Sequence, residues 1–481
     1  MEEKPTTGNA KKELNTMEEI FKSYFQAIGC FDYPAATKVA GRMSKINPGA
    51  STILTALSRC EQSYTSLDSL KSKLWRSKDV SFYHELIDVV ANLEIDAQKF
   101  LDLLYSDAVK DIHAKVSAQI AGAPAQSDAI YMIDVCRALG CFAKCRQNMN
   151  EVYRLIQNHQ YLDDVTPILE KIKIIGEEVR KEPFLKKLGI LVTGLNYEIA
   201  IMESLLAAQK GITSYNFKDT IVNLYTAKMN LSAWRELYSS QEYAEKSPNK
   251  AEDVSRGLFT WIIFERNSRP VKRNSGSPNL VQWMNRFHGD LTAKATLYFM
   301  QVLIDSDRGG LGQMWQRVEV DYHGEITNFR RTSNALCVAL VYEITDDAPF
   351  YVYGYICEGE KPADLDSDMD RFRCIYSYPK DQIAHSKDDK LWSSMISKLS
   401  QADRKPSVSP QRPIPIYETD KELKTTYYFL RIDIRVRLAV IHSTVHTGLD
   451  AQTSEFMTQI GTRLSNTYNL QSLGNFSEQA T

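Results

Sequence analysis

Apolar residues recur at spacings of three and four over most of the first 300 residues, which predicts a helical N-terminal part. The most regular stretch is 183–209, whose apolar positions share one helical face: Phe184, Leu188, Leu191, Leu195, Met202 and Leu205. Pro183 suits a first helical turn and Gly211 suits a helix end. This pattern predicts one central helix of about 40 Å, which neighbouring helices must cover.

Other stretches with the same periodicity predict further helices. They cover residues 16–29, 51–74, 80–105, 127–156, 161–180, 216–238 and 280–303. The first of them begins with a capping box, Thr16 and Glu19. Glu198 is the one acidic member of the central stripe, and a buried carboxylate can mark a functional site. The alternative is that Glu198 pairs with a neighbouring helix or lies at the edge of the stripe.

The apolar period changes to two in the last third of the chain, which predicts strands. The predicted strands are 335–344, 350–357, 372–378, 414–417, 425–434 and 435–443, followed by a helix at 454–470. The first two strands, joined by TDDAP, are typical of a hairpin. Pro413 and Pro415 restrict the strand at 414–417 to a sheet edge.

These patterns predict an α+β multidomain protein. An N-terminal all-α helical bundle precedes a smaller C-terminal α/β domain with a mainly antiparallel sheet, for which a roadblock- or longin-like module is a fold analogy. The predicted boundaries are a tail at 1–14, the bundle at 15–304 with a flexible insertion at 241–279, the mixed domain at 317–472 and a tail at 473–481.

Composition narrows the function classes. The 481 residues carry 58 basic and 60 acidic side chains, a net charge of −2, which gives no bulk attraction for nucleic acid or anionic lipid. Eight scattered cysteines indicate reduced thiols of the cytosol. No apolar run approaches a membrane span of about 18 residues, and no signal peptide is expected. We expect a cytoplasmic protein that reaches membranes by docking.

Three groups of residues resemble metal sites, and each has a plainer interpretation. Asp364, Asp366, Asp368 and Asp370 alternate as in a calcium loop, but Met369 and Ile375 replace the required glycine and carboxylate, so a solvated loop is favoured. Cys136 points away from Cys141 and Cys145 on a helix, which favours structural thiols. His84 and Glu85 begin an H-E-x-x-H motif that Asp88 does not complete.

Catalytic motifs are equally weak. His442 and His446 flank a strand end without an adjacent carboxylate–serine arrangement in the sequence. The run Gly309-Gly310-Leu311-Gly312 follows a helix, whereas a phosphate-binding loop precedes one. We therefore predict no catalytic residues, no metal site and no cofactor.

Two segments are candidate partner-binding surfaces. An apolar anchor with Trp261 and Phe264 adjoins a basic loop with Arg269, Lys272 and Arg273; the alternative is a buried segment before a solvated loop. On the last strands Arg431, Arg435 and Arg437 alternate with apolar residues, which favours an acidic partner, and a plain solvated sheet face is the alternative.

Several collinear stretches resemble the KICSTOR complex subunit 2 family, formerly an uncharacterised open-reading-frame family. They are FKSYFQAIGCFDY, WRSKDVSFYHEL, YEIAIMESLLAAQ, IVNLYTAKMNLSAW, LVQWMNRFHGDLTAKATLYF, TTYYFLR and RLAVIHST. The resemblance covers most of 17–304 and, more loosely, 320–470. The run LFTWIIFERNSRPVKRN and much of 360–411 depart from the family pattern.

The resemblance implies a non-enzymatic scaffold or adaptor. Such a subunit would bind kaptin, the integrin-FG-GAP-repeat protein and the large seizure-threshold scaffold, tether the GATOR complex at the lysosomal membrane, and act indirectly on Rag GTPases. It would restrain TOR kinase signalling when amino acids or glucose are scarce. Two alternatives stay open. One is a small-GTPase regulatory or membrane-trafficking platform, and the other is a hydrolase that uses the acidic loop and the histidines.

Overall fold

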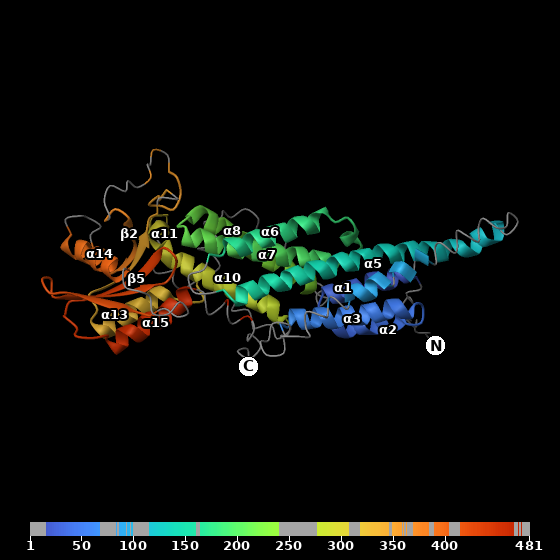
Figure 1. Ribbon diagram of the computed structural model, residues 1–481, viewed down its shortest axis with the longest axis horizontal. Helices are drawn as coiled ribbons and strands as arrows, with labels where there is room; N and C mark the ends of the chain where they lie inside the picture. Colours follow the sequence, from blue (N-terminus) through green and yellow to red (C-terminus); the bar gives the residue numbers. More distant parts are fainter. Residues whose placement is uncertain are drawn as a thin grey trace, which may run out of the picture. The chain divides into compact units, whose positions relative to one another are not determined.

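A computed structural model describes residues 16–67, 86–92, 115–159, 164–239, 277–306, 318–345, 349–357, 369–383, 389–403 and 414–465, with isolated positions between them (Figure 1). These residues form two compact units, each assembled from several chain segments. Unit 1 comprises 1–150, 175–197 and 234–244; unit 2 comprises 151–174, 198–233 and 245–481. The predicted domain boundaries stay a prediction.

Unit 1 is helical. Its helices include α1 (Met17–Gly29), α2 (Tyr33–Met43), α3 (Pro48–Thr65) and the larger part of α5 (Lys115–Gln157). Thr16 caps α1 by accepting a hydrogen bond from the N–H of Glu19, as the sequence predicted. Helix α2 was not predicted, although Asp32 caps it and a proline lies in its first turn.

A buried ion pair lies in the core of unit 1. Arg146 on α5 donates from Nε and Nη2 to both carboxylate oxygens of Glu61 on α3, each at 2.9 Å. Tyr83 donates to the same carboxylate at 2.8 Å, and the guanidinium lies 4.3 Å from the ring centroid of Tyr64. Both charges thus have several polar or aromatic partners, which compensate for the water that each charge loses on burial.

The central helix in the structure, α7 (Ile190–Thr213), begins later and ends later than the predicted range 183–209. Residues Phe184–Leu188 form a 3-10 turn, η2, and Gly189 adopts a φ of +53°. Helix α7 therefore begins at Ile190, because this backbone conformation breaks the helix. It continues through Gly211 to Thr213, so the predicted end was also wrong.

Helix α7 is also long and apolar enough to cross a membrane, with a mean hydropathy of 1.4 over its most apolar window. The prediction that no apolar run approaches the length of a membrane span was therefore wrong for this helix. In the structure 61% of this most apolar stretch is buried, and the core helix of a soluble protein can have the same length and composition as a membrane span. Glu198 belongs to this helix and has an exposed fraction of 0%. Its Oε1 accepts a hydrogen bond of 2.9 Å from Tyr153, so the prediction of pairing with a neighbouring helix is confirmed.

The helices of unit 2 include α10 (Asn279–Tyr298), α11 (Met300–Ser306) and parts of α6 (Thr166–Lys181) and α8 (Phe217–Ser239). The predicted helix at 280–303 is interrupted at Phe299. This residue is the C-cap of α10, and its ψ of 20° departs from helical geometry. Trp283 and Phe287 stack at 5.5 Å in the core of this unit. Unit 2 thus contains both packed helices and the sheet.

The sheet has five strands in the order β2-β1-β5-β4-β3, and each neighbouring pair is antiparallel. The strands are β1 (Cys337–Glu343), β2 (Phe372–Tyr378), β3 (Ile416–Asp420), β4 (Thr425–Arg431) and β5 (Val436–His442). Helix α14 (Lys390–Asp403) packs on one face, and α13 (Tyr322–Ser333) and α15 (Ala451–Leu464) cover the other (Figure 1). The predicted α+β class and antiparallel sheet are confirmed.

Two-sided coverage explains the sequence of the inner strands. All seven residues of β5 and six of seven in β1 are buried, and both strands are mostly apolar, as two-sided burial favours. The edge position predicted for the strand near Pro415 is confirmed, since β3 ends the sheet. Helices α13 and α14, which cover the sheet, were not predicted.

A second buried ion pair joins α10 to the turn between β4 and β5. Lys294 donates to Asp433 at 2.9 Å, and Tyr298 donates to the same carboxylate. Lys294 has an exposed fraction of 0%, and burial lowers its pKa while Asp433 opposes that shift. The pair fixes the hairpin turn against the helix.

Candidate functional site

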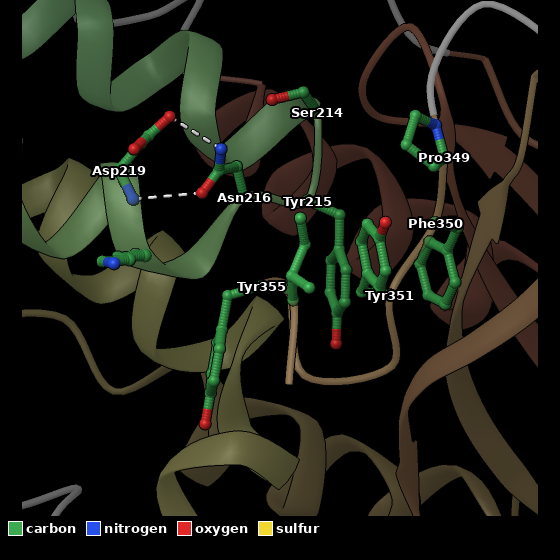
Figure 2. Close-up of a pocket in the computed structure, with 11 residues that line it drawn as sticks. Ser214, Tyr215, Asn216, Asp219, Pro349, Phe350, Tyr351 and Tyr355 are labelled. Atoms are coloured by element: carbon green, nitrogen blue, oxygen red, sulfur yellow. Dashed lines mark hydrogen bonds between the residues drawn. The ribbon is translucent and has the colours of Figure 1, made fainter. Parts of the chain in front are cut away.

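A pocket of about 480 Å³ lies in unit 2, between the turn that joins α7 to α8 and an irregular loop that follows β1 (Figure 2). The turn contributes Ser214, Tyr215, Asn216, Lys218 and Asp219. The loop contributes Pro349, Phe350, Tyr351, Gly354, Tyr355 and Ile356. One wall is therefore polar and the other is mostly aromatic.

The loop at 350–357 was predicted as the second strand of a hairpin, and this prediction was wrong. The chain forms turns there, and Gly354 adopts a φ of +69°. Its N–H donates to the carbonyl of Tyr351, and its own carbonyl accepts the N–H of Phe217 at 2.9 Å. The interior glycine was the signal that argued against a strand.

Gly354 also allows the loop to approach α8 closely. A Cβ added at Gly354 would lie 2.9 Å from the Cβ of Phe217 and 3.0 Å from the carbonyl oxygen of Tyr215. The loop therefore provides a hydrogen-bond acceptor for the first turn of α8, where N–H groups lack partners within the helix. Any larger residue would separate the two walls of the pocket.

An aromatic cluster forms the base of the pocket. Tyr215 and Phe350 stack with centroids 5.0 Å apart and an interplanar angle of 18°. Phe299 lies 5.0 Å from Tyr215 and 5.3 Å from Phe217. Burial raises the pKa of Tyr215, so its hydroxyl stays protonated at neutral pH. The base is rigid, because several rings from α8, α10 and the loop pack together.

Exposed apolar side chains are concentrated in this loop. Tyr355 and Ile356 line the pocket and have exposed fractions of 36% and 72%. Val352 and Tyr353, with exposed fractions of 56% and 38%, lie in the same loop but do not line the pocket. A pocket with a fixed aromatic base and an exposed apolar rim is typical of a protein-binding surface.

The polar wall is built by the start of α8. Asn216 accepts the N–H of Asp219 at 3.0 Å and donates to its carboxylate at 2.7 Å (Figure 2). Ser214 donates to the carbonyl of Lys210 at 2.9 Å and so closes the end of α7. These side chains satisfy the backbone groups at the two helix ends.

The partner-binding residues predicted from the sequence fall in two groups. Trp261, Phe264, Arg269, Lys272 and Arg273 lie outside the described residues. Arg431, Arg435 and Arg437 lie on or between β4 and β5 and do not line the pocket.

The structure places the three arginines differently. Arg431 is exposed and donates to the carbonyl of Ile434 at 2.6 Å. Arg435 donates to the hydroxyl of Tyr342 at 3.5 Å. Arg437 has an exposed fraction of 4% and pairs with Glu343 at 2.6 Å and with Asp403 at 2.9 Å. Its charge is already matched within the chain, whereas partner binding by Arg431 and Arg435 stays a prediction.

The candidate metal residues give no site within the described ranges, where no group of three or more His, Cys, Asp or Glu side chains is placed to hold an ion. Burial raises the pKa of Cys136 to about 12 and of Cys145 to about 11, so both thiols stay protonated. The repeat from Asp364 to Asp368, the pair His84–Glu85 and the glycine run at 309–312 lie outside the described residues.

The two histidines near the end of β5 do lie together, with ring centroids 4.7 Å apart. His442 contacts the hydroxyl of Thr453 at 3.0 Å, and Thr453 in turn donates to Asp450. His446 contacts the hydroxyl of Tyr428 at 2.7 Å. Asp450 and Thr453 could not be linked to the histidines from the sequence, because they reach them through the start of α15. The group joins β4, β5 and α15, and it does not line the pocket.

Fold and pocket together define the class: an α+β protein whose clearest described surface site has the chemistry of a protein-contact surface. A family described as "KICSTOR complex C12orf66 like" matches residues 12–477. The chain belongs to this family.

Two curated relatives are similar over part of their length. KICSTOR subunit 2 of Xenopus laevis is 23% identical over 278 residues, which cover 58% of this chain and 56% of that protein. KICSTOR subunit 2 of Danio rerio is 22% identical over 276 residues, covering 57% and 55%. The chain thus spans little more than half the length of the relatives it matches.

Proposed function

We propose that this protein is a non-enzymatic scaffold subunit of a KICSTOR complex. The observation that carries the proposal is the family match, which extends over residues 12–477 and therefore includes both units. The relatives are themselves named as KICSTOR subunits. We take kaptin, the integrin-FG-GAP-repeat protein and the large seizure-threshold scaffold as its partners within the complex.

The proposal extends to the role of the complex. The subunit contributes to tethering the GATOR complex at the lysosomal membrane, and it acts on Rag GTPases indirectly. It thereby supports the restraint of TOR kinase signalling during amino-acid or glucose starvation. The protein is cytoplasmic and peripheral at that membrane.

The pocket supports a contact role for unit 2. Its rim residues Tyr355 and Ile356 expose apolar surface over a rigid aromatic base, and aromatic residues of this kind dominate binding energy at protein interfaces. The pocket brings together none of the histidines considered for catalysis. We therefore place one partner surface of the scaffold at this pocket.

Affinity isolation tests the proposal. The tagged full-length chain is expressed in cells, and the other KICSTOR subunits and GATOR components are measured in the isolate. We expect the KICSTOR subunits with the wild-type chain and a loss of at least one of them with Ile356→Asp, which places a charge on the rim. Val352→Asp, in the same loop but outside the pocket, is the matched control. Isolation of the wild-type chain without any KICSTOR subunit would overturn the proposal.

A second candidate function is a small-GTPase regulatory or trafficking platform. The five-stranded antiparallel sheet covered by helices on both faces favours it by fold analogy. Binding to a Rag- or Rab-type GTPase in one nucleotide state would support this function. Equal binding to both nucleotide states would exclude a regulatory role.

A further inference from the structure

We propose that the pocket between the α7–α8 turn and the loop at 349–356 binds a proline-rich segment of a partner protein in the polyproline II conformation. This inference rests on the proposed function in one respect, because it takes the pocket as a partner surface. It adds the chemical class of the occupant, which the family match does not give.

The aromatic wall supports a proline-rich occupant. Tyr351 and Tyr355 line the pocket above the stacked pair of Tyr215 and Phe350, and Tyr355 lies 6.2 Å from the ring of Phe217. Grooves lined by aromatic rings are the usual recognition surface for polyproline II segments, whose preformed shape costs little conformational entropy on binding. Pro349 extends the same wall.

The polar wall has the complementary chemistry. A proline residue has no N–H, and a polyproline II helix makes no internal hydrogen bonds, so its carbonyls need outside donors. Lys218 offers an ammonium group on this wall, and Tyr351 and Tyr355 add hydroxyls that can donate. A pocket with donors on both walls suits a segment that is rich in acceptors.

Charge and size argue against a phosphate backbone, an anionic lipid or an amphipathic helix as the occupant. Lys218 and Asp219 are both exposed and of opposite sign, so the pocket has no net charge to attract a phosphate backbone or an anionic lipid. A volume of about 480 Å³ falls within the range of sites for small ligands, roughly 300 to 1,000 Å³. It accommodates a short extended segment better than the apolar face of an amphipathic helix, whose anchors span about two turns.

The experiment uses the full-length protein and a labelled synthetic twelve-residue peptide of proline with interspersed alanine and leucine. A second peptide of equal length has each proline replaced by alanine. Fluorescence anisotropy measures binding of both peptides. We expect the proline peptide to bind and its alanine counterpart to bind at least about tenfold more weakly, a difference of roughly 1.4 kcal/mol.

Two pairs of variants test the site. Tyr355→Ala and Ile356→Ala remove side chains that line the pocket, and each should weaken binding of the proline peptide about tenfold. Val352→Ala removes a β-branched side chain from the same loop outside the pocket, and it should leave the affinity for the proline peptide unchanged. Tyr353→Ala removes a tyrosine outside the pocket whose ring centroid lies 6.3 Å from that of Tyr355, and it should weaken binding less than Tyr355→Ala does. Circular dichroism and thermal unfolding confirm that all four variants fold as the wild type does.

Failure of this inference is distinguishable from failure of the proposed function. Absence of peptide binding, equal binding of the alanine peptide, or undiminished binding to both pocket variants would overturn the proline-rich occupant. If Ile356→Asp still loses KICSTOR subunits in that case, the pocket remains a partner surface with a different occupant. If the peptide binds as expected and the wild-type chain isolates no KICSTOR subunit, the occupant class stands and the complex assignment fails.

Discussion

The hydroxyl of Tyr153 donates a hydrogen bond of 2.9 Å to Glu198 Oε1, and the two side chains have exposed fractions of 1% and 0%. The acidic residue in an otherwise apolar stripe of α7 is thus held by α5. A buried carboxylate that loses a donor retains the cost of its own desolvation. The hydrogen bond therefore contributes to the stability of unit 2 by offsetting the desolvation of this carboxylate.

Tyr153→Phe should lower the free energy of unfolding by about 1 to 3 kcal/mol, because Glu198 loses this donor. Phenylalanine keeps the ring contact with Trp283, whose centroid lies 6.2 Å away, so the change isolates the hydroxyl. Urea unfolding followed by tryptophan fluorescence measures the difference. A loss below a few tenths of a kcal/mol would show that other contacts satisfy the carboxylate.

Arg146→Met should destabilise unit 1 by about 3 to 5 kcal/mol, because it leaves the carboxylate of Glu61 buried without its ion-pair partner. Arg137→Met is the matched control. Arg137 pairs with Glu94 at 2.8 Å, but the two side chains are 46% and 32% exposed. We expect this control to cost at most about 1 kcal/mol. Thermal unfolding measures the loss of stability in both variants. Equal losses would contradict the conclusion that burial makes the Arg146–Glu61 pair the more important one.

Gly354→Ala should displace the loop at 350–356 from α8, because the added Cβ would lie 2.9 Å from Phe217. Gly359→Ala is the control, since its φ of +82° is equally unfavourable but no heavy atom lies within 4 Å of an added Cβ. Both variants share a backbone cost of about 1 to 2 kcal/mol. We expect faster hydrogen exchange at the amides of 350–356 in Gly354→Ala alone, and equal exchange in both would contradict the close packing.

The histidine pair predicts a dependence of stability on pH. Burial lowers the pKa of His442, the neighbouring His446 lowers it further, and Asp450 opposes both. The folded state therefore binds a proton less readily than the unfolded chain, whose histidine has an ordinary pKa of 6.5. This contribution to stability is present above pH 6.5 and is lost as the pH falls through the pKa of the folded state.

We expect the free energy of unfolding of the wild type to fall between pH 7 and pH 5, and to fall less in His442→Gln. Thr453 donates its hydroxyl proton to Asp450, so it accepts from Nε2 of His442, and the glutamine amide can donate in the same way. The variant therefore removes the titration and keeps a donor. Unfolding at a series of pH values measures the effect. Identical slopes for the two proteins would assign the pH dependence to other groups.

The segment at 350–357 shows why sequence pattern misjudged the candidate site. FYVYGYIC has the aromatic and β-branched composition of a strand, and the strand predicted just before it, at 335–344, does form β1. The loop at 350–357 leaves the sheet because Gly354 contacts Phe217, a residue more than a hundred positions earlier. Local preference cannot report a contact of that separation, so the pocket was not predictable from the sequence.

The arginines of the last strands give a similar lesson. Their alternation with apolar residues predicted an open basic face, but Arg437 is buried against Glu343 and Asp403. Asp403 ends α14, a helix that the pattern did not predict. An alternating charge pattern fixes which face a side chain occupies, and the rest of the fold decides whether that face meets water.

The sequence by itself determined the helical N-terminal part, the antiparallel strands at the end of the chain and the membership suggested by collinear motifs. Each of these follows from periodicity or from order along the chain, which are local properties. The tertiary structure alone decided where α7 begins, which helices cover the sheet, and that a turn at 214–217 meets a loop at 350–356 to form a pocket. These features depend on contacts between residues far apart in the chain, whose free energy no single segment contains.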